Sequence, residues 1–385
     1  MAVRAFPIQA DPTLLADIRQ YGKFDTSGCY QCGSCTLSCD LVSDSATFPR
    51  KSIRYALLGL RSPLIASLDP WICHDCGDCS IVCPRQAEPR ISMITLRRFL
   101  TAQYEWTGIG SRLLQSKARY LGSLLAVAVL TLLLIVGYHL WYVGMAAKDF
   151  TKTPFGLEHM FLIMTYYTLV VVLLPLLLLL SRVIHIWRLT MSGEGISWVT
   201  YLREAWVYVY ESVVQPLMRK CPEHRRWLWH EFLAAGTVMM LAIKVFGLRW
   251  FQTDNIYPVY NPQRWVGYLA AGFILYGIGD ILIARWRAQT EIYKETHFRD
   301  LVFPVLILLT ALSGLAVHVL RYTGFALASH YAYALHVVIA TPMLVIEMSF
   351  GKWAHMIYRP LALYFLAVKD KAKQAPAGEV VTDAI

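Results

Sequence analysis

The stretch CYQCGSCTLSC at residues 29–39 and its counterpart CHDCGDCSIVCP at residues 73–84 decide how the first part of this chain folds. Both runs have the spacing C-x2-C-x2-C-x3-C, and together they hold eight of the nine cysteines. In such a run three closely spaced thiolates bind one face of an iron–sulfur cubane, while the fourth reaches across to a second cluster. Gly33 and Gly77 stand where the backbone must bend close to the inorganic sulfides. The runs therefore predict a domain with two [4Fe–4S] clusters.

The same spacing rule assigns each cysteine to a cluster. Paired CxxC motifs also bind zinc, but two quadruplets with this spacing favour clusters. The first run has Asp40 where the second has Pro84, so its match is less complete. Cys221, alone in a basic segment, is expected to be an ordinary free thiol. We expect the first cluster on Cys29, Cys32, Cys35 and Cys83, and the second on Cys39, Cys73, Cys76 and Cys79.

The segment between the runs carries apolar residues near helical spacing, at Ile53, Leu57, Leu60 and Ile65. This periodicity predicts a helix there rather than the strands of a small β-containing ferredoxin. We therefore expect an all-α fold class, with a mostly helical ferredoxin-like domain over residues 1–110.

The rest of the chain has the composition of a membrane protein. The sequence is 56% hydrophobic and 16% charged, with a mean hydropathy of +0.44, whereas soluble domains are about 25% charged. A spanning helix needs about 20 mostly apolar residues. Pro175 lies inside the second such run and predicts a kink. We expect a membrane cytochrome b domain over 111–369, a flexible tail over 370–385, and six spans at 121–145, 160–187, 227–248, 265–284, 301–320 and 331–353.

The basic residues predict the orientation of these spans. A net charge of +10 can indicate nucleic-acid binding, but Lys and Arg gather here before the first span, after the second and fourth, and after the sixth. By the positive-inside rule, both termini and the cluster domain face the cytoplasm of a multi-pass protein of the cytoplasmic (inner) membrane. The N-terminus lacks the apolar stretch of a signal peptide, which agrees with reduced thiols.

Within the loop 190–224, TYLREAWVYVYESVVQPL predicts an amphipathic surface helix.

Several of the eleven histidines lie in or beside the predicted spans, where polar side chains are costly and often functional. A bis-histidine haem needs one histidine from each of two helices at matching depth. His230 and His355 match on the cytoplasmic side and predict a proximal b haem. His318 and His336 match on the far side and predict a distal one. The nineteen residues from His336 to His355 would span about 28 Å of helix, so the two haems would be stacked across the bilayer.

Other histidines are alternatives to these ligands or have plainer roles. His185 is an alternative to His230, and His139 and His159 are alternatives to His318. His297 is expected to be a solvated interfacial residue, and His224 a loop residue. His74 follows a cluster cysteine and is expected to tune that cluster.

Three ionisable residues lie within the predicted spans. Lys244, toward the far face, is the candidate for a quinone site, where quinol oxidation needs a proton acceptor or a hydrogen-bond donor to the quinone oxygen. The alternative is that its side chain snorkels to the membrane interface. Asp280 and Glu347 are expected to pair with arginines on the cytoplasmic side.

These segments resemble known families. The cysteine runs look like the iron–sulfur C subunit of heterodisulfide reductase. The membrane part resembles the cytochrome b component of that enzyme (its E subunit) and, more distantly, the gamma subunit of respiratory nitrate reductase, through RRWLWHEFLAAG (225–236), ALHVVIATPMLVIEMSFGKWAHMIYRP (334–360) and SRVIHIW (181–187). Both parts in one chain are similar to the C subunit of the quinone-interacting membrane-bound oxidoreductase (Qmo) complexes of sulfate reducers.

This resemblance implies a quinol oxidoreductase subunit with two [4Fe–4S] clusters and two b haems. Such a subunit takes electrons from menaquinol and passes them to soluble flavin and iron–sulfur subunits, and onward to adenylylsulfate (APS) reductase in dissimilatory sulfate reduction. The nitrate reductase subunit has a second histidine about ten residues into the helix that matches the third span, where this chain has Met240. Met240 is therefore an alternative to His318 as axial ligand of the distal haem.

Two other classes of function compete with this one. The heterodisulfide reductase resemblance also fits a membrane electron-transfer subunit of a disulfide reductase, although the chain carries no flavin fingerprint. A membrane anchor or transporter with a structural metal domain is disfavoured by the eight-cysteine pattern and by the lack of an evident inverted repeat.

Overall fold

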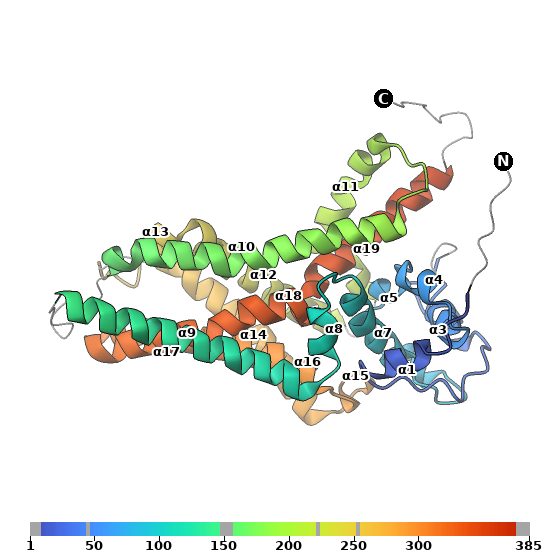
Figure 1. The fold of residues 1–385 in the computed structure, drawn as a ribbon, viewed down its shortest axis with the longest axis horizontal. Coiled ribbons are helices and arrows are strands. Elements are labelled where there is room, and N and C mark those ends of the chain that lie inside the picture. Colours follow the sequence, from blue (N-terminus) through green and yellow to red (C-terminus); the bar gives the residue numbers. More distant parts are fainter. Residues whose placement is uncertain (1–8, 44–46, 147–156, 221–223, 252–254, 375–385) are drawn as a thin grey trace.

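A computed structural model of the chain describes residues 9–43, 47–146, 157–220, 224–251 and 255–374. Within these ranges the fold is helical and has no β-strand, which confirms the predicted all-α class. Figure 1 shows short helices gathered at one end of a bundle of long helices. We call the end of the bundle next to the short helices the cluster end, and the opposite end the far end.

The short helices form a compact unit around one longer helix, α7 (Pro89–Gln103). This helix buries Met93, Leu96 and Leu100, one face at helical spacing. The core it belongs to also includes Leu14 and Ile18 of the first helix. The other short helices are α1 (Leu14–Arg19), α2 (Ser34–Leu37), α3 (Arg50–Leu57), α4 (Arg61–Ile65), α5 (Asp69–Ile72), α6 (Asp78–Ile81) and α8 (Ile109–Leu114).

The expected helix between the cysteine runs is two helices, because the chain turns between α3 and α4. Gly59 has a φ of +68°, and a Cβ atom there would lie 2.6 Å from the carbonyl oxygen of Asp11. Only glycine fits such a turn without strain. The apolar spacing predicted helix correctly, but it carried no signal for this break.

Among the described residues, six stretches are long and apolar enough to cross a membrane, as predicted. Large apolar side chains on the first of their helices are exposed, for example Leu125, Leu133 and Leu134, as expected of a surface that faces lipid. The helices are α9 (Lys117–Ala146), α10 (Leu157–Thr190), α12 (His224–Phe246), α14 (Pro262–Arg287), α16 (Phe298–Tyr322) and α17 (Ala326–Pro342), the last continuing through the π-helix η2 (Met343–Glu347) into α18 (Met348–Phe350).

The sixth span ends earlier than the sequence predicted. The chain breaks at Gly351, passes through the 3-10 turn η3 (Lys352–Ala354), and starts a separate helix, α19 (His355–Gln374). A Cβ atom on Gly351 would meet the side chains of Glu347 and Tyr120, with the Tyr120 hydroxyl oxygen at 2.7 Å, so a larger residue would displace them. His355 is therefore the first residue of α19 rather than the end of the sixth span. Residues 370–374, expected in the tail, continue that helix.

Close packing of α12 on α14 sets the position of the third span. A Cβ atom on Gly236 would lie 2.7 Å from the Ala270 carbonyl oxygen, and one on Gly277 would lie 2.7 Å from the Trp229 carbonyl oxygen. Small residues at such crossings let two membrane helices approach closely. The contact holds the start of α12, and so His230, at the cluster end.

The predicted surface helix exists as α11 (Trp198–Val213), which packs on α19. The Tyr364 hydroxyl donates a hydrogen bond to the Tyr201 carbonyl oxygen at 2.9 Å. The opposite face of α11 is apolar and exposed, through Trp198, Leu202, Trp206, Val209 and Val213. The remaining short elements are η1 (Pro216–Lys220), α13 (Leu248–Phe251) and α15 (Glu291–Lys294).

Candidate functional site

The two cysteine runs fold into matching turns. Gln31 and Gly33 in the first run have φ angles of +58° and +93°, and Asp75 and Gly77 in the second have +62° and +98°. Non-glycine residues rarely adopt positive φ, and such residues collect at functional sites. In each run the turn leads into a one-turn helix, α2 or α6. The backbone N–H of Asp75 donates to the Cys73 sulfur at 3.4 Å, so the turn directs amide groups toward the thiols.

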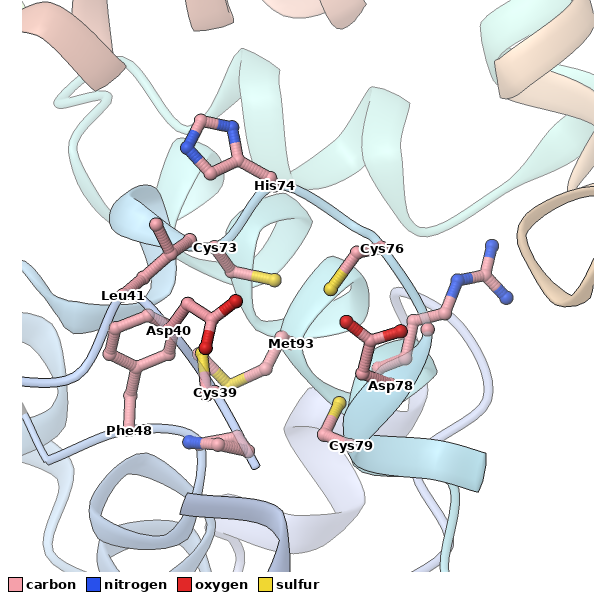
Figure 2. A pocket seen from close by; sticks show the side chains of 13 residues that line it. Cys39, Asp40, Leu41, Phe48, Cys73, His74, Cys76, Asp78, Cys79 and Met93 are labelled. Carbon is pink, nitrogen blue, oxygen red and sulfur yellow. The ribbon is translucent and has the colours of Figure 1, made fainter. Parts of the chain in front are cut away.

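The second cluster site is a small cavity lined by four thiols. Figure 2 shows the sulfur atoms of Cys39, Cys73, Cys76 and Cys79 directed into one space, with Met93 on its wall. Burial raises the pKa of the Cys39 thiol to about 11, and the nearby thiols of Cys73 and Cys76 raise it further. Cys39 of the first run thus lies among the cysteines of the second, although its role as a cluster ligand stays a prediction.

The first cluster site has the reciprocal arrangement. Burial raises the pKa of the Cys35 thiol, and the neighbouring thiols of Cys29, Cys83 and Cys32 add to this effect. The backbone N–H of Ala87 donates to the Cys83 sulfur at 3.4 Å. Cys83 of the second run thus lies near the cysteines of the first, and its role as a ligand of the first cluster stays a prediction.

The spacing of the two runs favours clusters over zinc. No three His, Cys, Asp or Glu side chains of the described residues converge as ligands of a single metal ion. Thiolates around a cubane stand farther apart than those around one ion, because four iron atoms lie between them. A buried thiol with a raised pKa stays protonated until a metal displaces its proton.

His230 and His355 meet at the cluster end of the bundle. Their ring centres are 6.1 Å apart, with 62° between the ring planes. Two imidazoles bonded to one metal at roughly 2 Å from opposite sides have ring centres about 6 Å apart. The Nδ1–H of His355 donates to the Lys352 carbonyl oxygen, which leaves Nε2 as the free ligand nitrogen. Burial lowers the pKa of His355 to about 4, so its ring is neutral, as a metal ligand must be.

The two rings open into a cavity of about 230 Å³ whose walls are rich in cations. The buried Nδ1 atom of His230 and two nitrogens of Arg299, Nε and Nη1, have no hydrogen-bond partner among the described residues. Buried polar atoms without partners suit contact with a bound polar group, and the surplus of positive charge suits an acidic one. A b haem needs two axial ligands and partners for its two propionates, and the two imidazoles and the arginines of this cavity fit these needs. The charged lining consists of Arg97, Arg98, Arg226, Arg285, Arg299, Arg359 and Lys352, against Asp75, Asp280 and Asp300.

Both histidine-bearing helices also contact the second cysteine run. Arg226, one turn before His230 on α12, donates to the Asp75 carbonyl oxygen at 3.0 Å. Arg359, one turn after His355 on α19, lies against the ring of His74. His74 is buried, and burial together with Arg359 lowers its pKa, so the ring is neutral. His74 and Asp75 thus line the wall between the histidine pair and the cluster cysteines.

A second cavity, of about 400 Å³, lies between the helices toward the far end. His318, His336, Met240 and Lys244 all line it. The Ser313 hydroxyl oxygen and the Nδ1 atom of His336 are 3.0 Å apart, at hydrogen-bond distance. The Nε2 of His318, in contrast, is 2.8 Å from the Tyr268 hydroxyl. The cavity therefore brings together the predicted distal ligands and their alternative, and it leaves the choice between His318 and Met240 open.

Arg264 makes this second cavity suitable for an acidic ligand. Its side chain is buried in the wall, and its Nε atom has no partner among the described residues. Within the part of the chain that the structure describes, the lining also includes Arg321 and no carboxylate. As at the cluster end, a histidine together with arginines that face no carboxylate fits a b haem and its acidic propionates.

The remaining histidines lie apart from both cavities or outside the described side chains. His139 on α9 is exposed, and His185 on α10 is half-buried; neither lines the two cavities. The side chains of His159 and His224, and the whole of Cys221, lie outside the described residues. His297 is the N-cap of α16, where its Nδ1 accepts from the Arg299 N–H at 3.4 Å.

Glu347 differs from its predicted environment. The Tyr120 hydroxyl donates to this fully buried carboxyl at 2.5 Å, and the Lys352 N–H donates at 3.2 Å. The sequence predicted an arginine partner, because basic residues near the ends of the spans can be located in a sequence. A contact with a tyrosine of another span cannot be predicted in that way. Asp280 and Arg285 both line the cavity at the cluster end, and the pairing of Asp280 with an arginine stays a prediction.

The sequence analysis did not predict the two arginines that lie between the histidine pair and the second cysteine run. The positive-inside rule treats Arg226 and Arg359 only as markers of topology, yet both contact the second cysteine run. The available signal was their spacing of four residues from His230 and His355, which puts each pair on one helix face.

Comparison with known proteins agrees with the cluster domain. Residues 25–87 match the family model of the 4Fe-4S dicluster domain. The chain is 33% identical over 88 residues to a protein of Archaeoglobus profundus described as similar to the C subunit of heterodisulfide reductase, covering 23% of this chain and 47% of that protein. It is 44% identical over 75 residues to the C2 subunit of the H(2)/formate:CoB-CoM heterodisulfide,ferredoxin reductase of Methanococcus maripaludis, covering 20% and 40%.

A third relative, the second iron-sulfur C subunit of the CoB--CoM heterodisulfide reductase of Methanocaldococcus jannaschii, is 42% identical over 69 residues, which cover 18% of this chain and 37% of that protein. The chain thus spans less than half the length of each of these relatives. No solved structure matches the chain. These relatives are named as C subunits of heterodisulfide reductases or as a C-like protein, and their similarity to this chain lies in its iron–sulfur domain.

Proposed function

We propose that this chain is the membrane subunit of a quinone-linked oxidoreductase, which carries electrons from menaquinol to soluble flavin and iron–sulfur subunits of the same complex. The observation that carries the proposal is the junction between the two parts of the chain. The helices that bear His230 and His355 also contact the loop between Cys73 and Cys76. Redox centres held on both sides of this loop would be close neighbours, as electron transfer requires.

The proposed cofactors follow from the donor sets. The eight cysteines of the two runs would hold two [4Fe–4S] clusters, divided as the spacing rule assigns them. His230 and His355 would hold the proximal haem b, and His336 with His318 or Met240 would hold the distal one. When bound, a haem b supplies one-electron transfer between quinol and clusters. The Lys352 carbonyl fixes the tautomer of His355, and the cavity arginines would bind the propionates.

Lys244 is proposed to bind the quinone. It lines the far-end cavity beside His336, so its ammonium group would donate a hydrogen bond to a quinone oxygen. The positive-inside bias supports a cytoplasmic cluster domain over about residues 1–110. Electrons would then pass from the far face to partners in the cytoplasm. We further propose that these partners lead to APS reductase.

The relatives favour a second candidate, a membrane electron-transfer subunit of a disulfide reductase. Their names associate the matching iron–sulfur domain with heterodisulfide reduction. Purification of the complex separates the two candidates. Flavoprotein partners and menaquinol-dependent reduction of the clusters would support the first, whereas a thiol-disulfide catalytic subunit would support the second.

The first test is cofactor content. The purified protein should show the α-band of haem b at about two haems per chain after dithionite reduction, with about eight irons in clusters. His355→Ala should remove one haem and leave the other, because it deletes an axial ligand of a single site. His139→Ala, an exposed histidine, is the matched control and should keep both. A protein that contains clusters but no haem would contradict the proposal.

A further inference from the structure

The cluster domain carries an apolar patch around its most open cysteine. Cys32 is exposed, whereas the other cysteines of the two runs are half-buried or buried. Within the two runs, four large apolar side chains have high exposed fractions: Tyr30 at 71%, Leu37 at 89%, Ile81 at 67% and Val82 at 42%. We call these four residues the cluster patch.

The members of the cluster patch belong to one surface. Leu37 ends α2 and Ile81 ends α6, each two residues after a cluster cysteine, and the two short helices are in contact. The guanidinium of Arg85, two residues after Cys83, lies 4.4 Å from the centre of the Tyr30 ring. Single exposed apolar residues need no explanation, but four around an accessible metal thiol indicate a contact surface. The patch lies outside the six candidate spans, so facing lipid along the bundle does not account for it.

Cations flank the patch and define its partner. Arg85 and Arg50 are both exposed. Arg85 covers Tyr30, and Arg50 reaches to within 3.4 Å of where a Cβ atom on Gly33 would stand. Gly33 follows Cys32 directly, so both guanidinium groups lie beside the first cluster site. Exposed charges around an apolar centre steer a partner of opposite sign.

We propose that the cluster patch is the docking surface for a soluble redox protein with an apolar contact face and an acidic rim. This inference rests on the proposed function, because it takes the first cluster as the point where electrons leave the chain. In each transfer, one electron passes from the reduced cluster, which is oxidised, to the flavin or iron–sulfur centre of the partner, which is reduced; no bond forms or breaks. Contact over the patch brings that centre to the shortest distance from Cys32.

The test is electron transfer from the dithionite-reduced full chain to an acidic flavodoxin, followed by stopped-flow absorbance. Leu37→Glu with Ile81→Glu should slow the second-order reaction at least tenfold, because two carboxylates replace apolar contacts and repel the acidic probe. The reaction with ferricyanide, which needs no docking, should change less than twofold. Leu58→Glu, an exposed leucine (51%) outside the patch, is the matched control.

The salt dependence of the flavodoxin rate tests the role of the two arginines. Replacing Arg50 and Arg85 by glutamine should flatten the dependence of the flavodoxin rate on salt, because the steering charges are gone. Equal rates for the patch variant and the Leu58→Glu control would overturn the docking surface. If the patch variant instead changes the oligomeric mass of the protein in detergent, the patch is a surface for self-association. That result would also overturn the proposed docking surface. Absence of iron–sulfur signals from the wild-type chain would refute the proposed function itself, which is a separate outcome.

Discussion

At the scale of single residues, the cysteine runs show how local backbone geometry prepares a metal site. Gln31 and Asp75 hold strained positive φ angles next to Gly33 and Gly77, and the same pattern appears in both runs. Strain of about 1–3 kcal/mol at a residue persists only where its surroundings impose it. The repeated geometry therefore marks each turn as part of a site rather than a chance loop.

Cys76 provides a direct test of the ligand assignment. In Cys76→Ser, a hydroxyl replaces a thiolate at the second cluster, so that cluster should be lost or converted while the first remains. Iron should fall from about eight to about four atoms per chain if the cluster is lost, and electron paramagnetic resonance should show one changed signal.

Cys221→Ser is the control for this experiment, because it removes a thiol outside both runs. It should leave both signals intact. Unchanged spectra in Cys76→Ser would refute the assignment.

At the scale of elements, α12 and α19 each join the membrane bundle to the cluster domain. Each presents a histidine to the shared cavity and, four residues away, an arginine to the second cysteine run. Residues four apart lie on one face of a helix, so one helix orientation sets both contacts. The two helices thereby fix the position of the loop between Cys73 and Cys76 relative to the pair His230 and His355.

Arg359 should also set the potential of the second cluster. A nearby cation stabilises the reduced, more negative state, and loss of one charge is worth about 1 kcal/mol in partly solvated surroundings. Arg359→Gln should therefore lower the midpoint potential of that cluster by roughly 40 mV for one electron. The first cluster, beyond this loop, should shift less.

Redox-poised electron paramagnetic resonance would measure both clusters in one titration. Arg54→Gln, which removes an exposed arginine on α3, is the matched control. Arg359→Lys should restore most of the potential, because the charge returns. If Arg359→Gln and Arg54→Gln have the same potentials, the arginine has no electrostatic role at the junction.

At the scale of the whole molecule, the two cavities lie at different heights of one helical bundle. The cavity of His230 and His355 borders the cluster domain, and the cavity of His336 and Lys244 lies toward the far end. Under the proposed function, electrons that enter at the far cavity would cross the bundle before they reach a cluster. Their path would then run along the long axis of the protein.

Lys244→Met tests the entry point of this path. Loss of a hydrogen bond from a charged group costs about 1.5–3 kcal/mol, so cluster reduction by a menaquinol analogue should slow by roughly ten- to a hundredfold. Reduction by dithionite, which bypasses the quinone site, should stay unchanged. Rapid-mixing absorbance would follow both reactions.

Lys371→Met is the control, because this lysine is exposed near the end of α19. It should behave as wild type with both reductants. Equal menaquinol rates in the two variants would exclude Lys244 from the quinone site.

Much of this architecture could be predicted because it rests on local signals. The spacing of the cysteines is fixed along the chain, and the thiols of Cys39 and Cys83 each lie near the cysteines of the other run, while the ligand assignment itself stays a prediction. The six spans follow from apolar length. His230 and His355 were paired by depth alone, and their rings do meet.

The kind of domain, the number of spans and the cysteine spacing were thus readable from the amino-acid sequence, since these depend on composition and on distance along the chain. Folding in three dimensions was needed to set the break at Gly351, the burial of Glu347 against Tyr120, and the contacts of Arg226 and Arg359 with the second cysteine run. It also placed Tyr268 on His318, which leaves the distal ligand open. Each of these features joins residues from separate helices, and which helix faces touch is set by packing of the whole bundle.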